Sequence, residues 1–273
     1  MAKEKKTGLL EKLVPVLLIA SIALAFFVGV LWQKVTYLEG GKVTGTQQTG
    51  TTPTGTQQQA KDAPNVTIEQ IKDLFAKDLI KFGDANKKVL LVEVADPSCP
   101  YCHIAAGLNP ELNAQVGERF KLVSDGGAYV APVTEMRKLV DSGQASYVYI
   151  YQNGHGNGEM GQKALYCAYE KGKFWEAHDL LMTNSGYNLL NNTVKNDKAQ
   201  SQTLADFLKT AVNSADMKSC LEGGKYDDRI TNDMSLANSM GIGGTPGFFI
   251  NTTNFGGAYS WNDMKSAVDT ALQ

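Results

Sequence analysis

Two cysteines separated by two residues constrain this chain more than any other feature of its sequence. Cys99 and Cys102 enclose Pro100 and Tyr101, and they closely follow the apolar run at 89–95. A continuous apolar run of this length predicts a buried strand. Proline suits the first position of a helix, because its missing N–H needs no partner there. The sequence therefore predicts a strand, a tight turn and a helix, with Cys99 at the helix N-cap.

The expected N-cap position would change the acidity of Cys99. Unpaired N–H groups and the positive end of the helix dipole favour a thiolate over a thiol, so we expect a lowered pKa for Cys99. Cys102, one turn further along, is expected to be buried and to act as the resolving thiol. A zinc site or an inert bridge is the alternative, but zinc needs two more ligands at suitable spacing. Since Cys167 and Cys220 stand alone, we expect redox chemistry with no metal and no cofactor.

Residues 13–32 form an apolar segment without a charged side chain, and four lysines precede it. A helix of that length rises about 30 Å, the thickness of a hydrocarbon core. The positive-inside bias places residues 1–12 in the cytoplasm and the bulk of the chain outside. A cleaved signal peptide, with its cleavage site near 23–25, and a buried helix of a soluble core are the alternatives. The sequence predicts a single-pass anchor in the lipid bilayer of the cell membrane.

The segment 33–64 is expected to be a flexible linker. Gly, Thr, Gln and Pro dominate it from residue 40 onward, and such a composition buries too little apolar surface to offset its conformational entropy. The folded domain is expected over 65–273. A formal net charge of −2 for the whole chain argues against a nucleic-acid partner, which needs a clustered basic face.

Periodicity within the folded part predicts an α/β domain in which helices separate two groups of strands. Strands are expected at 89–95, 146–152 and 247–250, with a short turn and strand around 255–259. Helices are expected at 66–82, 135–140, 160–171, 174–182, 204–213, 227–240 and 261–272.

Two further features lie near the dithiol in the expected fold. Glu93 is a charged residue inside an apolar strand, which is costly unless the residue has a partner or a function. A raised pKa would suit a proton shuttle for Cys102, whereas a carboxylate at the strand end facing solvent is the plainer interpretation. Thr245-Pro246 lies between a Gly-rich turn and an apolar strand, where an ordinary turn proline is also possible.

Four stretches together resemble the DsbA-like family of thiol–disulfide oxidoreductases, and in particular its membrane-anchored bacterial branch. They are VEVADPSCPYC, ALYCAYEKGKFWEAHDLLM, CLEGGKYDDRI and GIGGTPGFFI. The resemblance implies a thioredoxin fold with an inserted helical domain at about 154–240, preceded by a transmembrane helix and a linker. It maps the nucleophile to Cys99, the resolving thiol to Cys102 and a cis-proline loop to Thr245-Pro246. It also supports Glu93 as the acid beneath the dithiol.

Other residues are less strongly assigned. Cys167 and Cys220 fall in stretches where the family sometimes has a second bridge, so a structural disulfide is expected. Two buried free thiols or a second redox pair are the alternatives. His103 follows the dithiol and is expected to be a partly exposed bystander rather than a group that tunes the thiolate. The segments 117–143 and 152–161 depart from the family pattern and could reshape the substrate groove.

The expected activity is the introduction of disulfides into exported proteins outside the cytoplasm. Reduced exported proteins would be the clients, and a membrane partner linked to quinone would reoxidise the dithiol. An isomerase or reductase using the same two cysteines is the first alternative. A non-catalytic surface binding protein that kept the fold is the second.

Overall fold

The computed structural model describes residues 66–273, so the expected segments at 1–12, 13–32 and 33–64 lie outside the described residues. Within 66–273 no helix is long and apolar enough to cross a membrane. The centre is a five-stranded sheet in the order β1-β3-β2-β4-β5. The central strands β2 and β3 are parallel and all other neighbours are antiparallel. The strands are β1 (Ile80–Phe82), β2 (Val89–Ala95), β3 (Ala145–Tyr151), β4 (Gly247–Ile250) and β5 (Thr253–Gly256).

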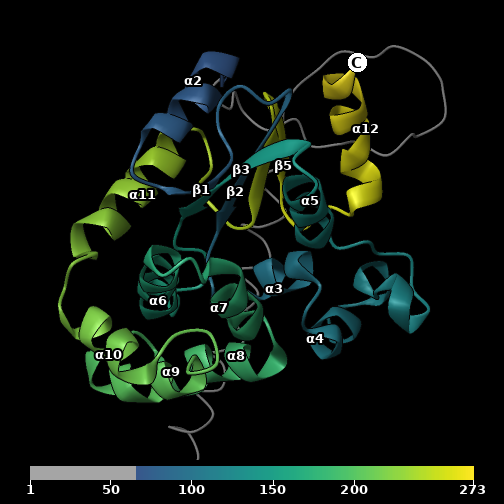
Figure 1. The fold of residues 1–273 in the computed structure, drawn as a ribbon. Helices are drawn as coiled ribbons and strands as arrows, with labels where there is room; N and C mark the ends of the chain where they lie inside the picture. The colour runs from purple at the N-terminus through teal and green to yellow at the C-terminus, as the bar shows by residue number, and fades with distance from the viewer. Residues whose placement is uncertain (1–65) are drawn as a thin grey trace, which may run out of the picture. The chain divides into compact units, whose positions relative to one another are not determined.

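Helices surround this sheet and fill the long connection between β3 and β4 (Figure 1). The α-helices are α2 (Ile68–Asp73), α3 (Pro100–Ala106), α4 (Pro110–Gln115), α5 (Pro132–Asp141), α6 (Glu159–Glu170), α7 (Phe174–Leu181), α8 (Asn184–Asn188), α9 (Ser201–Phe207), α10 (Ser214–Glu222), α11 (Asp227–Ser239) and α12 (Trp261–Leu272). Short 3₁₀ or π turns are η1 (Leu74–Ala76), η2 (Glu118–Phe120), η3 (Val123–Asp125), η4 (Leu189–Val194) and η5 (Lys198–Gln200).

The strand β2 is buried on both faces, as its continuous apolar run predicts. Leu90, Val92 and Val94 share one core with side chains of α2 and α11. Leu91 and Ala95 belong to the opposite core, together with side chains of α5, α6, α7 and α12. Figure 1 shows α2 and α11 on one side of the sheet and α5 and α12 on the other. Because side chains alternate along a strand, Glu93 lies on the same face as Leu91 and Ala95.

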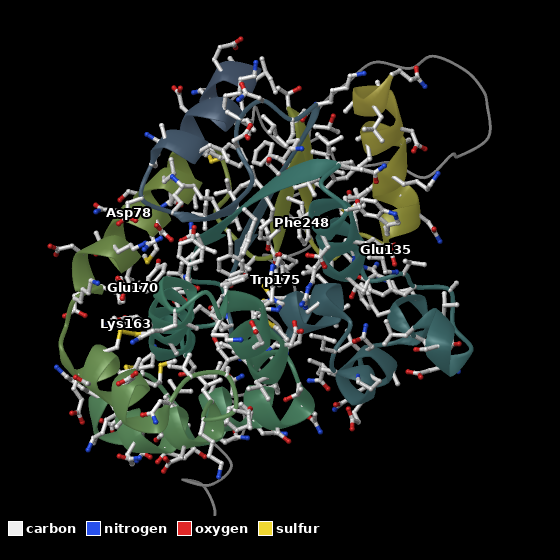
Figure 2. The ribbon with its side chains drawn as sticks, viewed as in Figure 1. Asp78, Glu135, Lys163, Glu170, Trp175 and Phe248 are labelled. Carbon is white, nitrogen blue, oxygen red and sulfur yellow. A yellow bond between two sulfur atoms is a disulfide. The ribbon has the colours of Figure 1, made fainter. Side chains whose placement is uncertain are left out.

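The helical segment between β3 and β4 contains a disulfide. Cys167 on α6 and Cys220 on α10 are bonded, with their Cα atoms 6.2 Å apart (Figure 2). Figure 1 shows α6 and α7 next to the sheet and α9 and α10 beyond them. The bridge therefore fastens the outer helices to a helix that packs on the sheet.

The expected helix at 66–82 is wrong over its second half. The helix α2 ends at Asp73, one short turn follows, and Ile80–Phe82 forms β1. Ile80 pairs with Tyr149 of β3 in an antiparallel ladder, and this long-range pairing overrides the local helical spacing. The predicted helix at 204–213 is also corrected: α9 ends at Phe207, and a separate helix, α10, starts at Ser214.

Replacing both Cys167 and Cys220 by serine is expected to lower the free energy of unfolding of the domain by about 4 kcal/mol. A bridge that closes a loop with a sequence separation of 53 residues restricts the unfolded chain by about that amount in the chain-entropy model. Guanidinium denaturation of the double variant measures the loss. The Cys99→Ser variant is the control, because it leaves the bridge intact. Equal free energies of unfolding for both variants would contradict a stabilising role for the bridge.

Candidate active site

The dithiol lies where β2 passes into α3. Cys99 is the N-cap of α3 and Pro100 is the first helical residue. The backbone N–H of Cys99 donates to the carbonyl of Asp96 at 3.0 Å, which closes the tight turn after the strand. The strand, turn and helix occur as the sequence predicts, and the sulfur of Cys99 is placed at the first turn of α3.

The environment of Cys99 favours the thiolate. The pKa of Cys99 is lowered to about 6, and the largest cause is a hydrogen bond from the Cys102 thiol. The Thr245 side chain and the backbone N–H groups of Cys102 and Tyr101 contribute to this lowering, whereas burial acts in the opposite direction. These N–H groups belong to the first turn of α3, where helical amides have no intrahelical partner. Cys99 can therefore act as a nucleophile near neutral pH.

Cys102 has the opposite character. Its side chain is 0% exposed, and burial raises the pKa of its thiol, with a further rise from the hydrogen bond to Cys99. The backbone N–H of Asp96 lies 3.4 Å from the Cys102 sulfur as a donor. Cys102 is thus a buried thiol that keeps its proton while Cys99 is ionised.

The loop before β4 faces the dithiol. The Thr245–Pro246 peptide is cis, and the Cys99 thiol points at the carbonyl of Thr245 over 3.4 Å. The loop reaches this position because β4 pairs with β2, with Gly247 opposite Val94. The family resemblance predicts a cis-proline loop at Thr245-Pro246, and the structure places this loop next to Cys99.

Glu93 lies in the interior of the domain and is 1% exposed. Its carboxylate accepts a hydrogen bond of 2.5 Å from the hydroxyl of Tyr147. Burial raises the pKa of Glu93, although the charge of His178 and the hydrogen bond from Tyr147 both lower it. The interpretation of Glu93 as a solvent-facing residue at the strand end is therefore wrong, because the face of β2 that carries it is covered by helices.

His103 is also placed differently from the sequence expectation. The side chain is 0% exposed rather than partly exposed. One ring nitrogen lies 3.0 Å from the carbonyl of Met182 and the other lies 2.9 Å from the carbonyl of Pro97. Burial lowers the pKa of His103 to about 4, so the neutral ring can donate to only one of these carbonyls at a time. His103 joins α3 to the end of α7 and carries no charge near neutral pH.

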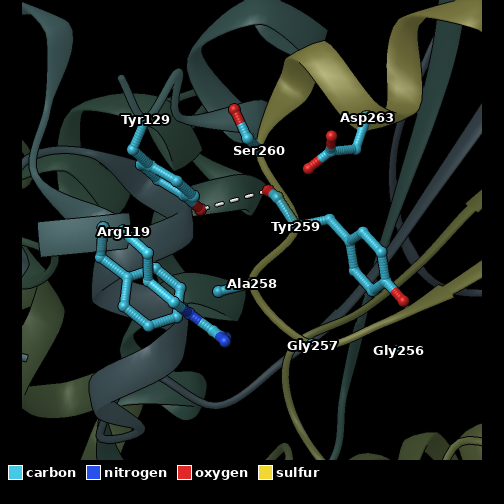
Figure 3. Close-up of a pocket in the computed structure, with 9 residues that line it drawn as sticks. Arg119, Tyr129, Gly256, Gly257, Ala258, Tyr259, Ser260 and Asp263 are labelled. Atoms are coloured by element: carbon cyan, nitrogen blue, oxygen red, sulfur yellow. Dashed lines mark hydrogen bonds between the residues drawn. The ribbon is translucent and has the colours of Figure 1, made fainter. Parts of the chain in front are cut away.

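The segment 117–143 lines one side of a cavity near the dithiol helix. Tyr101 is 44% exposed, and its ring packs edge-on against Phe120 with centroids 5.8 Å apart. Beyond Phe120 lies a cavity of about 480 Å³ lined on one side by Arg119 and Tyr129 and on the other by residues 256–260 and Asp263. Figure 3 shows the Tyr129 hydroxyl donating across it to the carbonyl of Tyr259. The cavity contains neither cysteine of the dithiol.

Several residues around the dithiol were not singled out from the sequence. Asp96 is fully buried and holds the turn, while Tyr147 and Tyr149 lie on the same face as Glu93. The sequence could have predicted that the two tyrosines share a face, because alternation along 145–151 places every second side chain on one side of the strand. In the described part of the chain, no group of three His, Cys, Asp or Glu residues is arranged to hold a metal ion.

A family model described as Thioredoxin matches residues 133–270. The chain belongs to the thioredoxin family. The matched range contains the Thr245-Pro246 loop and starts after the dithiol. The fold described above is accordingly a thioredoxin-type sheet with helices inserted between β3 and β4.

Solved structures share this fold at low sequence identity. The thiol-disulfide exchange protein alpha-DsbA2 of Wolbachia pipientis is 20% identical, with a TM-score of 0.53 over 74% of this chain and 92% of that one. BdbD of Bacillus subtilis is 16% identical, with a TM-score of 0.52 over 71% of this chain and 92% of that one. At these identities the likeness concerns the fold.

Two curated proteins also match part of the chain. The Na(+)/H(+) antiporter NhaA 3 of Salinispora tropica is 26% identical over 194 residues, which is 70% of this chain and 24% of the antiporter. NhaA 1 of Salinispora arenicola is 25% identical over 197 residues with the same coverage. The chain thus spans about a quarter of the length of the curated relatives it matches.

The Thr245→Val variant is expected to raise the pKa of Cys99 above about 6. The buried Thr245 hydroxyl has no hydrogen-bond partner among the described residues, so it is free to donate to the Cys99 thiolate and helps to lower this pKa. Valine keeps the shape of threonine but cannot donate to the thiolate. Thiolate absorbance near 240 nm, followed against pH, measures the change. Thr253→Val, on the exposed strand β5, is the matched control. An unchanged Cys99 titration in Thr245→Val would contradict a role for the hydroxyl.

The Glu93→Gln variant is expected to gain stability over the wild type as pH rises. Burial raises the pKa of Glu93, so the folded state holds this proton more tightly than the unfolded state does. The wild type therefore loses about 1.4 kcal/mol per pH unit between the usual Glu pKa of about 4.3 and the raised value. Glutamine, which still accepts from Tyr147, lacks this loss. The free energy of unfolding of both proteins, measured by denaturation at several pH values, tests this difference. Glu118→Gln, at an exposed position, is the control.

Proposed function

We propose that this chain is an extracytoplasmic thiol–disulfide oxidase that introduces disulfides into exported proteins. The observation that carries the proposal is the contrast between the two sulfurs. Cys99 has its pKa lowered to about 6 at the helix start, and Cys102 has its pKa raised by burial one turn behind it. A stabilised thiolate favours the reduced form, which makes the corresponding disulfide a stronger oxidant.

The reaction starts from the oxidised Cys99–Cys102 pair. A client thiolate attacks the Cys99 sulfur, a client–Cys99 disulfide forms, and the bond to Cys102 breaks. Cys102 receives the electron pair and a proton, for which the buried Glu93 carboxyl is the proposed donor. The second client thiolate then attacks the client sulfur, and Cys99 leaves as a thiolate. The client loses two electrons and the Cys99–Cys102 pair gains them.

The loop at Thr245-Pro246 is the proposed docking edge for the client backbone. The Thr245 carbonyl lies 3.4 Å from the Cys99 sulfur, so an extended segment along this loop would bring its own sulfur to Cys99. Pro100 and Tyr101 complete the motif: the proline starts α3, and the 44% exposed tyrosine ring offers apolar contact at the edge of the site.

The proposed location and partners rest on the sequence alone. Residues 13–32 are proposed to anchor the chain in the cell membrane with residues 1–12 in the cytoplasm, and 33–64 is proposed to link the anchor to the domain. A membrane partner linked to quinone is the proposed oxidant that removes two electrons from the reduced pair. An isomerase or reductase using the same cysteines is the competing activity. An oxidase is expected to have a higher reduction potential than a reductase.

The reduction potential of residues 60–273 is expected to lie well above the about −270 mV of thioredoxin. The slope of this potential against pH is expected to change near pH 6, at the pKa of Cys99. Below the Cys99 pKa both reduced sulfurs carry protons, so the potential falls by about 59 mV per pH unit; above it only Cys102 does, and the slope is about 30 mV. Equilibration in glutathione buffers, followed by trapping of the free thiols, measures both.

Two outcomes would contradict the proposal. A reducing potential like that of thioredoxin would assign the chain to reduction, with a membrane source of electrons. Oxidation of a reduced client by the Cys99→Ser variant at the wild-type rate would show that the dithiol is not the reacting group and would favour a binding protein.

A further inference from the structure

The Gly-rich loop at 153–158, between β3 and α6, is bound to a buried carboxylate of the dithiol turn. Asp96 is 0% exposed. One of its carboxylate oxygens accepts the backbone N–H groups of Gly154 and His155, both at 2.9 Å. The other accepts the backbone N–H and the hydroxyl of Ser98, both at 2.7 Å. Four hydrogen bonds thus converge on Asp96, two from the loop and two from the turn that carries Cys99.

A second set of contacts closes the same junction. The Ser98 hydroxyl, which donates to Asp96, also accepts the backbone N–H of Asn157 at 3.2 Å. The side-chain NH₂ of Asn191 donates to the Ser98 carbonyl at 3.1 Å, and the side-chain oxygen of Asn191 accepts from the side-chain NH₂ of Asn157 at 3.1 Å. The loop is therefore fixed both to the dithiol turn and to the helical segment that contains Asn191.

Two glycines allow the loop to approach the site closely. A Cβ atom at Gly158 would lie 1.7 Å from a carboxylate oxygen of Asp96, and one at Gly154 would lie 1.8 Å from the hydroxyl oxygen of Thr245. Both distances are far inside van der Waals contact. The loop consequently packs against the dithiol turn at Gly158 and against the cis-proline loop at Gly154, while His155 between them is exposed.

The backbone of Asp96 also contacts both reacting residues. Its carbonyl accepts the N–H of Cys99 at 3.0 Å, and its N–H points at the Cys102 sulfur over 3.4 Å. One residue therefore fixes the sulfurs through its main chain and the neighbouring loop through its side chain. Changing the side chain can move the loop while the main-chain contacts to the sulfurs stay in place.

We propose that Asp96 is a positioning residue that holds loop 153–158 as a rigid wall of the client site, next to Thr245. The inference rests on the proposed function and deepens it: the wall aligns an extended polypeptide along the Thr245-Pro246 loop and brings its thiolate in line with Cys99. A small thiol reaches Cys99 without this alignment. The wall therefore sets the preference for polypeptide clients over small thiols.

The first test is Asp96→Asn. Asparagine has the shape of aspartate but only one acceptor oxygen, so its NH₂ group must face either the two loop N–H groups or the two donors of Ser98. With a reduced peptide that carries a pair of cysteines, kcat/KM is expected to fall by about tenfold, mainly through a higher KM, because buried donors left without partners release the loop. The rate with dithiothreitol is expected to stay near the wild-type value, because the contacts of Asp96 to the two sulfurs come from its main chain.

The second variant, Gly154→Ala, leaves the charge of Asp96 in place and puts a Cβ atom 1.8 Å from the Thr245 hydroxyl oxygen, so that the loop and the Thr245 side chain can no longer pack as closely. It is expected to produce the same loss with the peptide and the same small effect with dithiothreitol. Asp206→Asn is the matched control, since Asp206 is a surface carboxylate that accepts from Ser214 and Gln202. This control is expected to leave both rates at the wild-type value.

The outcomes separate the inference from the function on which it rests. If Asp96→Asn or Gly154→Ala lowers the two rates equally, or lowers neither, the loop is no client wall and the inference is overturned. If one of these variants does not fold, the inference is judged on the other variant, from the ratio of its rate with the peptide to its rate with dithiothreitol. If the wild-type protein oxidises neither the peptide nor dithiothreitol, the proposed function itself fails.

Discussion

Burial of the central strand β2 on both faces is the constraint on which the rest of the structure depends. Backbone pairing fixes β3 along the whole of β2 and fixes β4 from Leu91 to Val94, and helices cover both faces of β2. A strand held this firmly delivers its C-terminal end to a defined point. The turn at that end places Cys99 on the first turn of α3, and the pairing with β4 places the Thr245 carbonyl opposite the sulfur.

The chemistry of the site follows from the different surroundings of its ionisable groups. A hydrogen bond from Cys102 and the N–H groups at the helix start favour the thiolate of Cys99, whereas burial disfavours charge on Cys102 and on Glu93. The contrast lets one sulfur ionise while the other keeps its proton. Tyr147 donates a hydrogen bond to the Glu93 carboxylate, and burial raises the pKa of the Tyr147 and Tyr149 phenols, which lie on the same face of β3.

Local patterns predicted the elements with the strongest signals. The continuous apolar run gave β2, the proline after Cys99 gave the start of α3, and the amphipathic spacing gave α12 with its bounds. The pattern failed where a long-range contact decides the outcome. The helical spacing at 66–82 continues past Phe75, but Ile80–Phe82 pairs with β3 and becomes β1. Likewise, His103 lies on α3 as expected, yet it is completely buried, with the carbonyl of Met182 at the end of α7 as one of its partners.

The sequence by itself determined the dithiol, its place between a strand and a helix, and the family resemblance carried by four short stretches. These depend on residues that are neighbours along the chain, so spacing and local preferences suffice. The same resemblance predicted the bridge between Cys167 and Cys220, which the structure contains. Only the tertiary structure decided that Glu93 is buried and that Asp96 holds the loop at 153–158. These contacts join residues more than fifty positions apart, or depend on which helix covers a strand face, and no local pattern encodes them.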